Sequence, residues 1–204
     1  MKTLIFDLGG VIITIDQQQA IDRFKEKGVS SIEKYLNPYM QQGIFGDLEE
    51  GKITAEEFIV EVNKISNQPL LYDDCRYCWL GYLKEVPAHG LRALRQLRSE
   101  GYRLLLLSNT NPFMMSWADS KDFDGEGNPL SHYFDNMYLS YKLKLMKPSH
   151  DIFAHLLANE NLQPENCIFV DDGPRNVLAA SEMGFTTLRP ENGEDWLPAL
   201  RKLL

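Results

Sequence analysis

The chain has 204 residues, 44% of them hydrophobic, which is enough to bury a full core as one large domain or as a domain with an insertion. Its formal net charge of -8 argues against nucleic acid as a partner, because a phosphate backbone is normally bound by a concentrated basic face. The N-terminal apolar run is too short for a signal peptide, no other run could span a bilayer, and three cysteines fit a reducing compartment. We therefore expect a soluble cytoplasmic protein that has no membrane partner.

The first predicted element is a strand over residues 4–6, where three apolar residues lead directly into Asp7. The pattern then changes, because residues 16–85 show helical spacing with no convincing strand between the helices. One helix start is marked by a capping box, with Thr54 at the N-cap and Glu57 three residues later. We predict that residues 16–85 form a separate helical unit over the carboxyl end of the first strand.

After residue 85 the chain alternates between helical patterns and short apolar runs. Helices are predicted over 91–97 and 152–157, and strands over 104–107, 137–139, 168–170 and 186–188. Runs that are apolar at every position are typical of parallel strands buried on both faces. Residues 1–15 and 86–204 are therefore predicted to form an open, doubly wound α/β core whose site lies at the carboxyl ends of its parallel strands.

Polar residues that could carry chemistry follow or punctuate these elements in four places. They are Asp7, Ser108 with Asn109, Lys147, and Asp171 with Asp172. The sheet would gather them at one edge, where three close carboxylates repel one another unless a hard divalent cation lies between them. Magnesium is the natural candidate for that cation. Ser108 and Asn109 can donate hydrogen bonds to phosphoryl oxygens, and Lys147 supplies a positive charge that offsets the phosphate.

Four motifs resemble those of a known family. Residues 6–11, 107–111, 147–148 and 170–172 read FDLGGV, LSNTN, KP and VDD, and in this order they resemble the four motifs of the haloacid dehalogenase superfamily. The predicted helical unit is similar to the small cap domain of that family. The resemblance implies a Rossmann-like core with a helical cap, and magnesium-dependent hydrolysis of a small phosphorylated metabolite.

The resemblance also assigns roles to individual residues. Asp7 would attack phosphorus in line and form an aspartyl-phosphate that water then hydrolyses. Asp7 and the carbonyl group of Gly9 would hold magnesium, with Asp172 as the preferred further ligand and Asp171 as the second choice. Lys147 would hold the nucleophile in place, and Lys147, Ser108 and Asn109 would bind the substrate.

Gly9 departs from the usual pattern of the superfamily. In most of its phosphatases the residue two after the nucleophile is a second aspartate, which protonates the leaving alcohol, and a positioned general acid is typically worth about 10²- to 10⁴-fold in rate. The motifs around Asp7 and Asp172 most closely resemble a branch of small bacterial enzymes that dephosphorylate glucose 1-phosphate and also lack this aspartate. A sugar phosphate such as glucose 1-phosphate is therefore the expected substrate, and Asp16 is one substitute for the missing acid.

Two other functions remain open on the sequence. A haloacid dehalogenase uses the same aspartate on carbon and also lacks an acid at the Gly9 position, but it needs no metal, whereas the pair Asp171 and Asp172 favours magnesium and hence phosphate. A binding protein that kept the fold after losing turnover would also tolerate Gly9.

Overall fold

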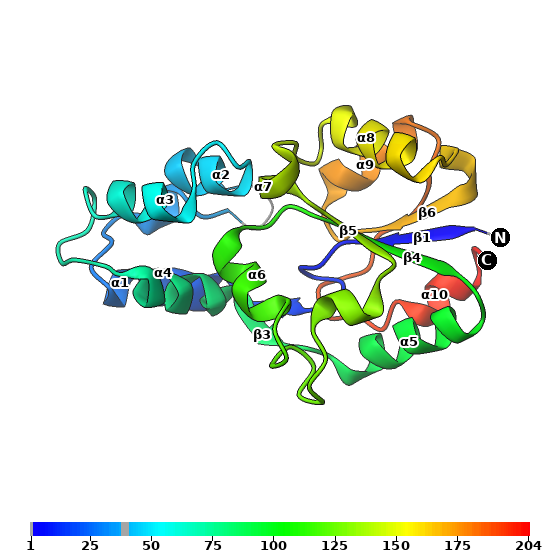
Figure 1. The fold of residues 1–204 in the computed structure, drawn as a ribbon, viewed down its shortest axis with the longest axis horizontal. Helices are drawn as coiled ribbons and strands as arrows, with labels where there is room; N and C mark the ends of the chain where they lie inside the picture. Colours follow the sequence, from blue (N-terminus) through cyan, green and yellow to red (C-terminus); the bar gives the residue numbers. More distant parts are fainter. Residues whose placement is uncertain (1, 38–40) are drawn as a thin grey trace.

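A five-stranded parallel sheet forms the centre of the structure, a computed structural model that describes residues 2–37 and 41–204 (Figure 1). In the order in which they pair, its strands are β5 (Asn136–Leu139), β4 (Arg103–Ser108), β1 (Thr3–Phe6), β6 (Cys167–Val170) and β7 (Thr186–Leu188). Every neighbouring pair is parallel. Each predicted strand is thus confirmed, as is the doubly wound α/β fold.

Helices cover both faces of this sheet (Figure 1). One face carries α8 (His150–Glu160) and α9 (Pro174–Glu182), and the other carries α5 (Ala88–Ser99) and α10 (Leu197–Arg201). Successive residues of β1 point to opposite faces, so Ile5 joins the buried cluster of α8 and α9 while Phe6 packs on Trp196, with ring centroids 4.9 Å apart. Burial on both faces is the reason that the strands are apolar throughout.

The predicted helical unit lies at one end of the sheet (Figure 1). It contains α1 (Gln17–Glu26), α2 (Gly43–Glu49), α3 (Ala55–Val62) and α4 (Tyr72–Trp79). Aromatic rings fill its centre, where Phe45 contacts Phe24 and Phe58 edge-on at centroid distances of 5.1 and 5.0 Å. The capping box is confirmed, because Thr54 Oγ1 accepts from the backbone N–H of Glu57 and the Glu57 carboxylate accepts from that of Thr54.

Two short strands join the helical unit to the core. The chain enters through β2 (Thr14–Ile15) and leaves through β3 (Leu83–Glu85), and the two pair antiparallel. The expectation that residues 16–85 contain no strand is therefore wrong for β3. Its three residues are too few to show a strand pattern, and it forms because the chain enters and leaves side by side, as the hydrogen bond from Asp16 N to Tyr82 O at 2.8 Å shows. The division into units at residues 15 and 86 stays a prediction.

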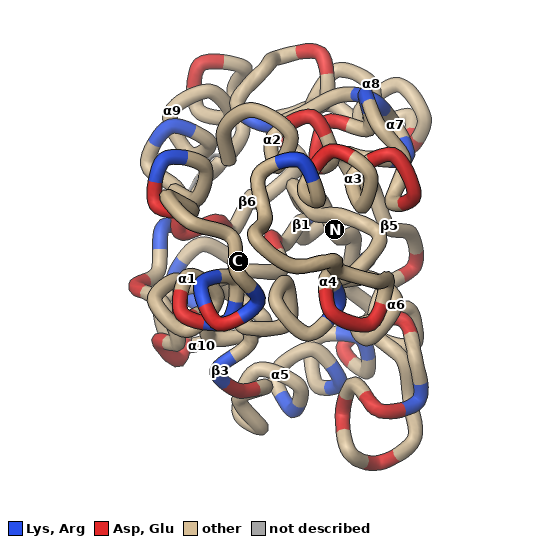
Figure 2. Tube along the Cα trace, turned by 90° about the vertical axis from the view of Figure 1, so that its left-hand side faces the viewer, with Lys and Arg blue, Asp and Glu red and all other residues tan. Residues whose placement is uncertain are grey.

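The remaining elements are short. They are α6 (Pro112–Ala118), α7 (Ser140–Leu143) and four 3₁₀ turns, η1 (Ile32–Lys34), η2 (Leu80–Tyr82), η3 (Leu130–Tyr133) and η4 (Pro164–Asn166). Within residues 2–37 and 41–204, no helix has the length and apolar character needed to cross a membrane. Seen from the end that carries the helical unit, lysine and arginine are interspersed with acidic residues (Figure 2).

Candidate active site

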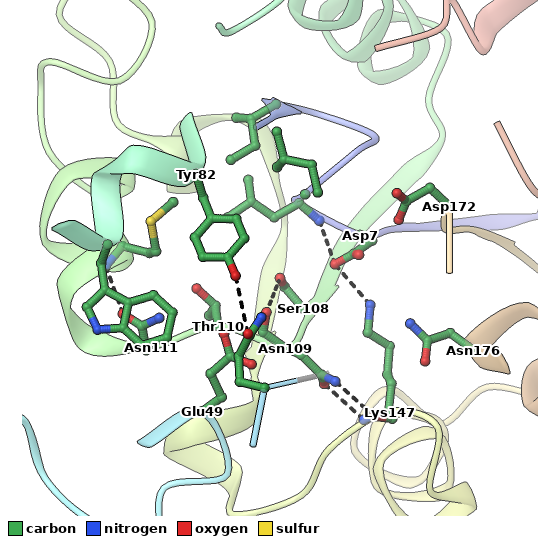
Figure 3. Close-up of a pocket in the computed structure, with 17 residues that line it drawn as sticks. Asp7, Glu49, Tyr82, Ser108, Asn109, Thr110, Asn111, Lys147, Asp172 and Asn176 are labelled. Atoms are coloured by element: carbon green, nitrogen blue, oxygen red, sulfur yellow. Dashed lines mark hydrogen bonds and ion pairs between the residues drawn. The ribbon is translucent and has the colours of Figure 1, made fainter. Parts of the chain in front are cut away.

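The carboxyl ends of neighbouring strands bring the predicted site residues together. Asp7 directly follows β1, Ser108 ends β4, and Asp171 directly follows β6, with Asp7 N donating to Val170 O at 2.9 Å. Asp7 and Ser108 border a pocket of about 710 Å³, a volume that includes solvent at its mouth, and Asp171 lies buried beneath it. The lining contains Asp7, Gly9, Ser108, Asn109, Lys147 and Asp172 (Figure 3). The sheet therefore gathers these residues as predicted, although their roles stay predictions.

Lys147, in the segment that precedes α8, pairs with two carboxylates. Its Nζ lies 2.9 Å from Asp7 Oδ1 and 2.6 Å from Asp171 Oδ2. The residue is only 2% exposed, so water screens these pairs weakly. Burial lowers the pKa of Lys147, but the charges of Asp171 and Asp7 raise it by more, so the net shift is upward. Lys147 is therefore a fixed positive charge beside the Asp7 carboxylate.

Asn109 fixes the backbone of Lys147. Its side-chain Oδ1 accepts a hydrogen bond from Lys147 N at 2.9 Å, and its Nδ2 donates to Lys147 O at 2.8 Å. An amide NH₂ has two donors, so one hydrogen of Nδ2 is left for a ligand. The clamp on Lys147 is a contact that the sequence did not indicate, while the predicted donation from Asn109 to a phosphoryl oxygen stays a prediction.

The two acids of the fourth motif, Asp171 and Asp172, have different surroundings. Asp171 is fully buried, and its oxygens accept from Lys147, from the Gly173 N–H at 2.7 Å and from Asn176 Nδ2 at 3.1 Å. Asp172 lines the pocket and forms no salt bridge with any residue of the described ranges. One oxygen from each of Asp7, Asp171 and Asp172 lies within 4.8 Å of the others. A cation in the pocket would therefore find Asp172 free and Asp171 already occupied.

Burial, together with the crowding of these carboxylates, shifts the pKa values of Asp7 and Asp172. Burial raises the pKa of Asp7 to about 6, with Asp171 adding to the rise and Lys147 opposing it. Burial also raises the pKa of Asp172 to about 7, with added repulsion from Asp7 and Asp171. Both carboxyl groups are thus harder to ionise than usual, as expected of a site whose negative charge calls for a cation.

Asp172→Asn is expected to stabilise the metal-free protein at pH 8. A carboxyl whose pKa is raised on folding binds more protons in the native state, so stability is lost as the pH rises from about 4 through 7, which is the range in which Asp172 ionises. Allowing for solvent screening of this partly exposed group, the variant should gain about 1–3 kcal/mol in unfolding free energy at pH 8.

The measurement is urea unfolding in EDTA at pH 8 and pH 4.5, with Asp151→Asn as a control at an exposed position of α8. The gain should vanish at pH 4.5, where Asp172 is protonated in the native state. A variant less stable than the parent at pH 8 in EDTA would contradict the electrostatic account.

The glycines of the first motif differ in what the fold demands of them. Gly10 has a φ of +75°, and a Cβ there would lie 2.2 Å from Asp172 Oδ2, so a side chain would displace that carboxylate. A Cβ on Gly9 would meet only Ile15 Cγ2, at an ordinary contact distance of 3.5 Å. Packing around the Cβ position therefore does not explain why residue 9 lacks an acidic side chain.

Asp16 does not replace the missing acid. Its carboxylate caps α1 by accepting a hydrogen bond from Gln19 N at 3.1 Å, and it is absent from the pocket lining among the described residues. This suggestion from the sequence is therefore wrong, because an N-cap position holds the side chain on its own helix.

The helical unit and the loop after β4 supply further lining residues that sequence reasoning missed. They are Gln41, Glu49, Trp79, Tyr82 and Asn111 (Figure 3). Two of their donors, Trp79 Nε1 and Asn111 Nδ2, are buried without a hydrogen-bond partner among the described residues. No local pattern distinguishes them, because they are ordinary helix and loop residues until the fold closes them over Asp7.

The chain is similar to proteins of one known family. Residues 1–184 match the family model of the haloacid dehalogenase-like hydrolases. The chain is 41% identical over 204 residues to a D-ribitol-5-phosphate phosphatase of Bacteroides thetaiotaomicron, covering 100% of this chain and 98% of that protein.

Solved structures are also similar to this chain. A predicted HAD-like family hydrolase from Porphyromonas gingivalis matches with a TM-score of 0.94 and 40% identity, covering 100% of this chain and 97% of that one. A HAD family enzyme from Bacteroides thetaiotaomicron, solved in complex with magnesium and inorganic phosphate, matches with a TM-score of 0.89 and 33% identity, covering 98% of this chain and 100% of that one.

Proposed function

This chain belongs to the haloacid dehalogenase-like hydrolase family, and we propose that it is a magnesium-dependent phosphatase of polyol or sugar phosphates that uses Asp7 as its nucleophile. It is a phosphoric monoester hydrolase that acts on a phosphorylated metabolite, as its full-length similarity to a phosphatase indicates. Three features support the finer proposal: the setting of Asp7, the carboxylate cluster and the donors of the pocket.

The setting of Asp7 suits covalent catalysis. Its Oδ1 accepts from Leu8 N at 2.7 Å and pairs with Lys147 Nζ at 2.9 Å, so the carboxylate is held in one orientation at the pocket. Attack by a carboxylate oxygen on phosphorus would break the bond to the leaving oxygen and give an aspartyl-phosphate. Water would then release phosphate and restore Asp7. Lys147 would offset the negative charge on the phosphoryl group, and Ser108, which lines the pocket, would donate a hydrogen bond to it.

The carboxylate cluster fits a magnesium ion. Hard divalent cations prefer carboxylate and carbonyl oxygens, and the pocket lining offers Asp7, Asp172 and the backbone of Gly9, with Asp171 as the less available fourth residue. The ion would neutralise the crowded carboxylates and the phosphoryl oxygens. The similar enzyme solved with magnesium and inorganic phosphate supports this assignment.

The buried donor Trp79 Nε1, which has no hydrogen-bond partner among the described residues, is the observation that carries the substrate class. A buried donor without a partner is costly, so a ligand that accepts a hydrogen bond from Trp79 would be favoured. Hydroxyl groups of a polyol or sugar can do this, and each can also donate to Glu49 or Gln41. The likeness to a ribitol-5-phosphate phosphatase makes D-ribitol 5-phosphate our first choice and glucose 1-phosphate our second.

The test is phosphate release from D-ribitol 5-phosphate, glucose 1-phosphate, ethyl phosphate and p-nitrophenyl phosphate, each with magnesium or with EDTA. We expect magnesium-dependent turnover, with kcat/KM for ribitol 5-phosphate at least about 100-fold above that for ethyl phosphate, because only the polyol offers hydroxyl groups to Trp79 and the other polar side chains of the pocket. Equal rates on the two alkyl esters would contradict the polyol assignment. Halide release from 2-chloropropionate in EDTA would favour a dehalogenase, and no release from any compound would favour a binding protein.

A further inference from the structure

An alkyl phosphate such as ribitol 5-phosphate poses a chemical problem for this site. Its leaving oxygen departs as a strongly basic alkoxide unless a proton reaches it during bond cleavage, and a positioned acid is typically worth about 10²- to 10⁴-fold. Gly9 has no side chain to give that proton, and Asp16 caps α1. If the proposed function holds, another group at the pocket must therefore donate this proton.

Glu49 is the carboxyl group that the helical unit brings to the pocket. It is the last residue of α2, only 8% exposed, and it lines the same pocket as Asp7. In Figure 3 Asp7 and Glu49 lie on different sides of the pocket, with Ser108 and Asn109 between them. In-line transfer places the leaving oxygen on the side of phosphorus away from the nucleophile, which is the side toward Glu49.

Contacts between the helical unit and the core fix the position of Glu49. Ser140 Oγ donates to the carbonyl oxygen of Glu49 at 2.5 Å, and the same hydroxyl accepts from Thr110 N at 3.0 Å. Two residues later, a Cβ on Gly51 would lie 2.2 Å from Tyr141 O, so the chain passes directly against the core. Glu49 is therefore held beside the loop that follows β4 rather than left on a free surface.

The surroundings of Glu49 favour its protonated form at neutral pH. Burial raises its pKa to about 8, the charge of Asp7 adds to the rise, and the amide group of Asn111 opposes it. Tyr82 also faces this group, but its hydroxyl donates to Gln41 at 3.2 Å and its own pKa is raised by burial and by Glu49. Lys147 is paired with Asp7 and Asp171. Glu49 is thus the carboxyl group that the helical unit brings to the pocket in protonated form, with no ion-pair partner among the described residues.

We propose that Glu49 is the general acid and base of this enzyme, supplied by the helical unit in place of the acid missing at Gly9. As Asp7 forms its bond to phosphorus, the bond from phosphorus to the alkyl oxygen breaks, and the Glu49 proton passes to that oxygen to give the alcohol. The Glu49 carboxylate then takes a proton from the water that attacks the aspartyl-phosphate. This step releases phosphate, restores the Asp7 carboxylate and leaves Glu49 protonated again.

The test compares wild type and Glu49→Gln on two classes of ester that lack sugar hydroxyls. A fall in rate then reports the loss of the acid and not the loss of contacts between Glu49 and sugar hydroxyls. One class is simple alkyl phosphates, and the other is aryl phosphates of graded leaving-group pKa down to p-nitrophenol. We expect kcat for alkyl phosphates to fall about 10²- to 10⁴-fold, while kcat for p-nitrophenyl phosphate falls less than about tenfold. Glu49→Asp should recover part of the alkyl activity, because it keeps an acid on a shorter side chain.

The pH profile gives a second readout that does not depend on any variant. Wild-type kcat for alkyl phosphates should fall as the pH rises through about 8, where Glu49 loses its proton, while the p-nitrophenyl rate should lack this fall. Glu50→Gln is the matched control, because Glu50 pairs with Lys52 at 2.7 Å outside this pocket and should keep wild-type rates on both classes.

Two results would separate the inference from the function on which it rests. An equal loss in Glu49→Gln on alkyl and aryl esters would overturn the role of Glu49 and leave the phosphatase intact. A wild-type protein that releases phosphate from no ester would overturn the proposed function itself, and with it the need for an acid.

Discussion

Asp7→Asn is expected to lower phosphate release by about 10⁴-fold or more on every ester, alkyl and aryl alike. An amide oxygen is a poor nucleophile and cannot form a stable phosphoryl intermediate. The covalent mechanism is therefore lost for every ester, whichever leaving group it carries. The substitution is nearly isosteric, and it also removes one of three crowded carboxylates, so the fold should remain. The measurement is kcat with magnesium, together with mass spectrometry of acid-quenched enzyme to detect the covalent phosphate.

Asp22→Asn is the matched control, since Asp22 lies exposed on α1 and accepts a hydrogen bond from Gln18. It should keep the wild-type rate and the covalent signal. Turnover by Asp7→Asn within about tenfold of wild type would show that phosphorus is attacked by another group or directly by water. This outcome is distinct from the Glu49 prediction, because loss of the acid spares activated aryl esters and loss of the nucleophile spares none.

Lys147→Met is expected to destabilise the metal-free protein by about 3–5 kcal/mol at pH 8 and to abolish measurable turnover. Lys147 Nζ lies between Asp7 and Asp171, and removing one partner of a buried ion pair leaves the other charges without compensation. Methionine keeps most of the side-chain volume, so the loss reports charge rather than packing. The measurement is urea unfolding in EDTA.

The loss of stability should be smaller at pH 5. Asp7 has a raised pKa even with Lys147 present, so without the lysine its carboxyl would remain protonated at pH 5 and carry no charge to bury. Lys142→Met is the matched control, because Lys142 is exposed on α7 and contacts only the face of Tyr141 among the described cation–ring pairs. A destabilisation below about 1 kcal/mol at pH 8 would mean that Lys147 does not hold the carboxylates together.

The sequence by itself was sufficient to predict the strands of the core and the edge of the sheet at which the reacting groups lie. Buried parallel strands are apolar at every position, so the strands from 4–6 to 186–188 could be recognised locally. Asp7, Ser108 and Asp171 stand at the ends of such strands, and parallel strands bring their carboxyl ends to one edge. Strand identity and chain order were therefore enough to predict that these residues meet.

Only the tertiary structure decided what surrounds that edge. Ser140 holds Glu49 through a hydrogen bond that joins residues 91 positions apart, and the side chain of Asn109 clamps Lys147 across 38 positions. Such contacts leave no local pattern, because an acid at a helix end and an asparagine in a loop have the same spacing whether exposed or buried. The short pairing of β2 with β3 also arises only when the chain enters and leaves the helical unit side by side. The sequence thus determined where the nucleophile lies, and folding decided which residues close over it.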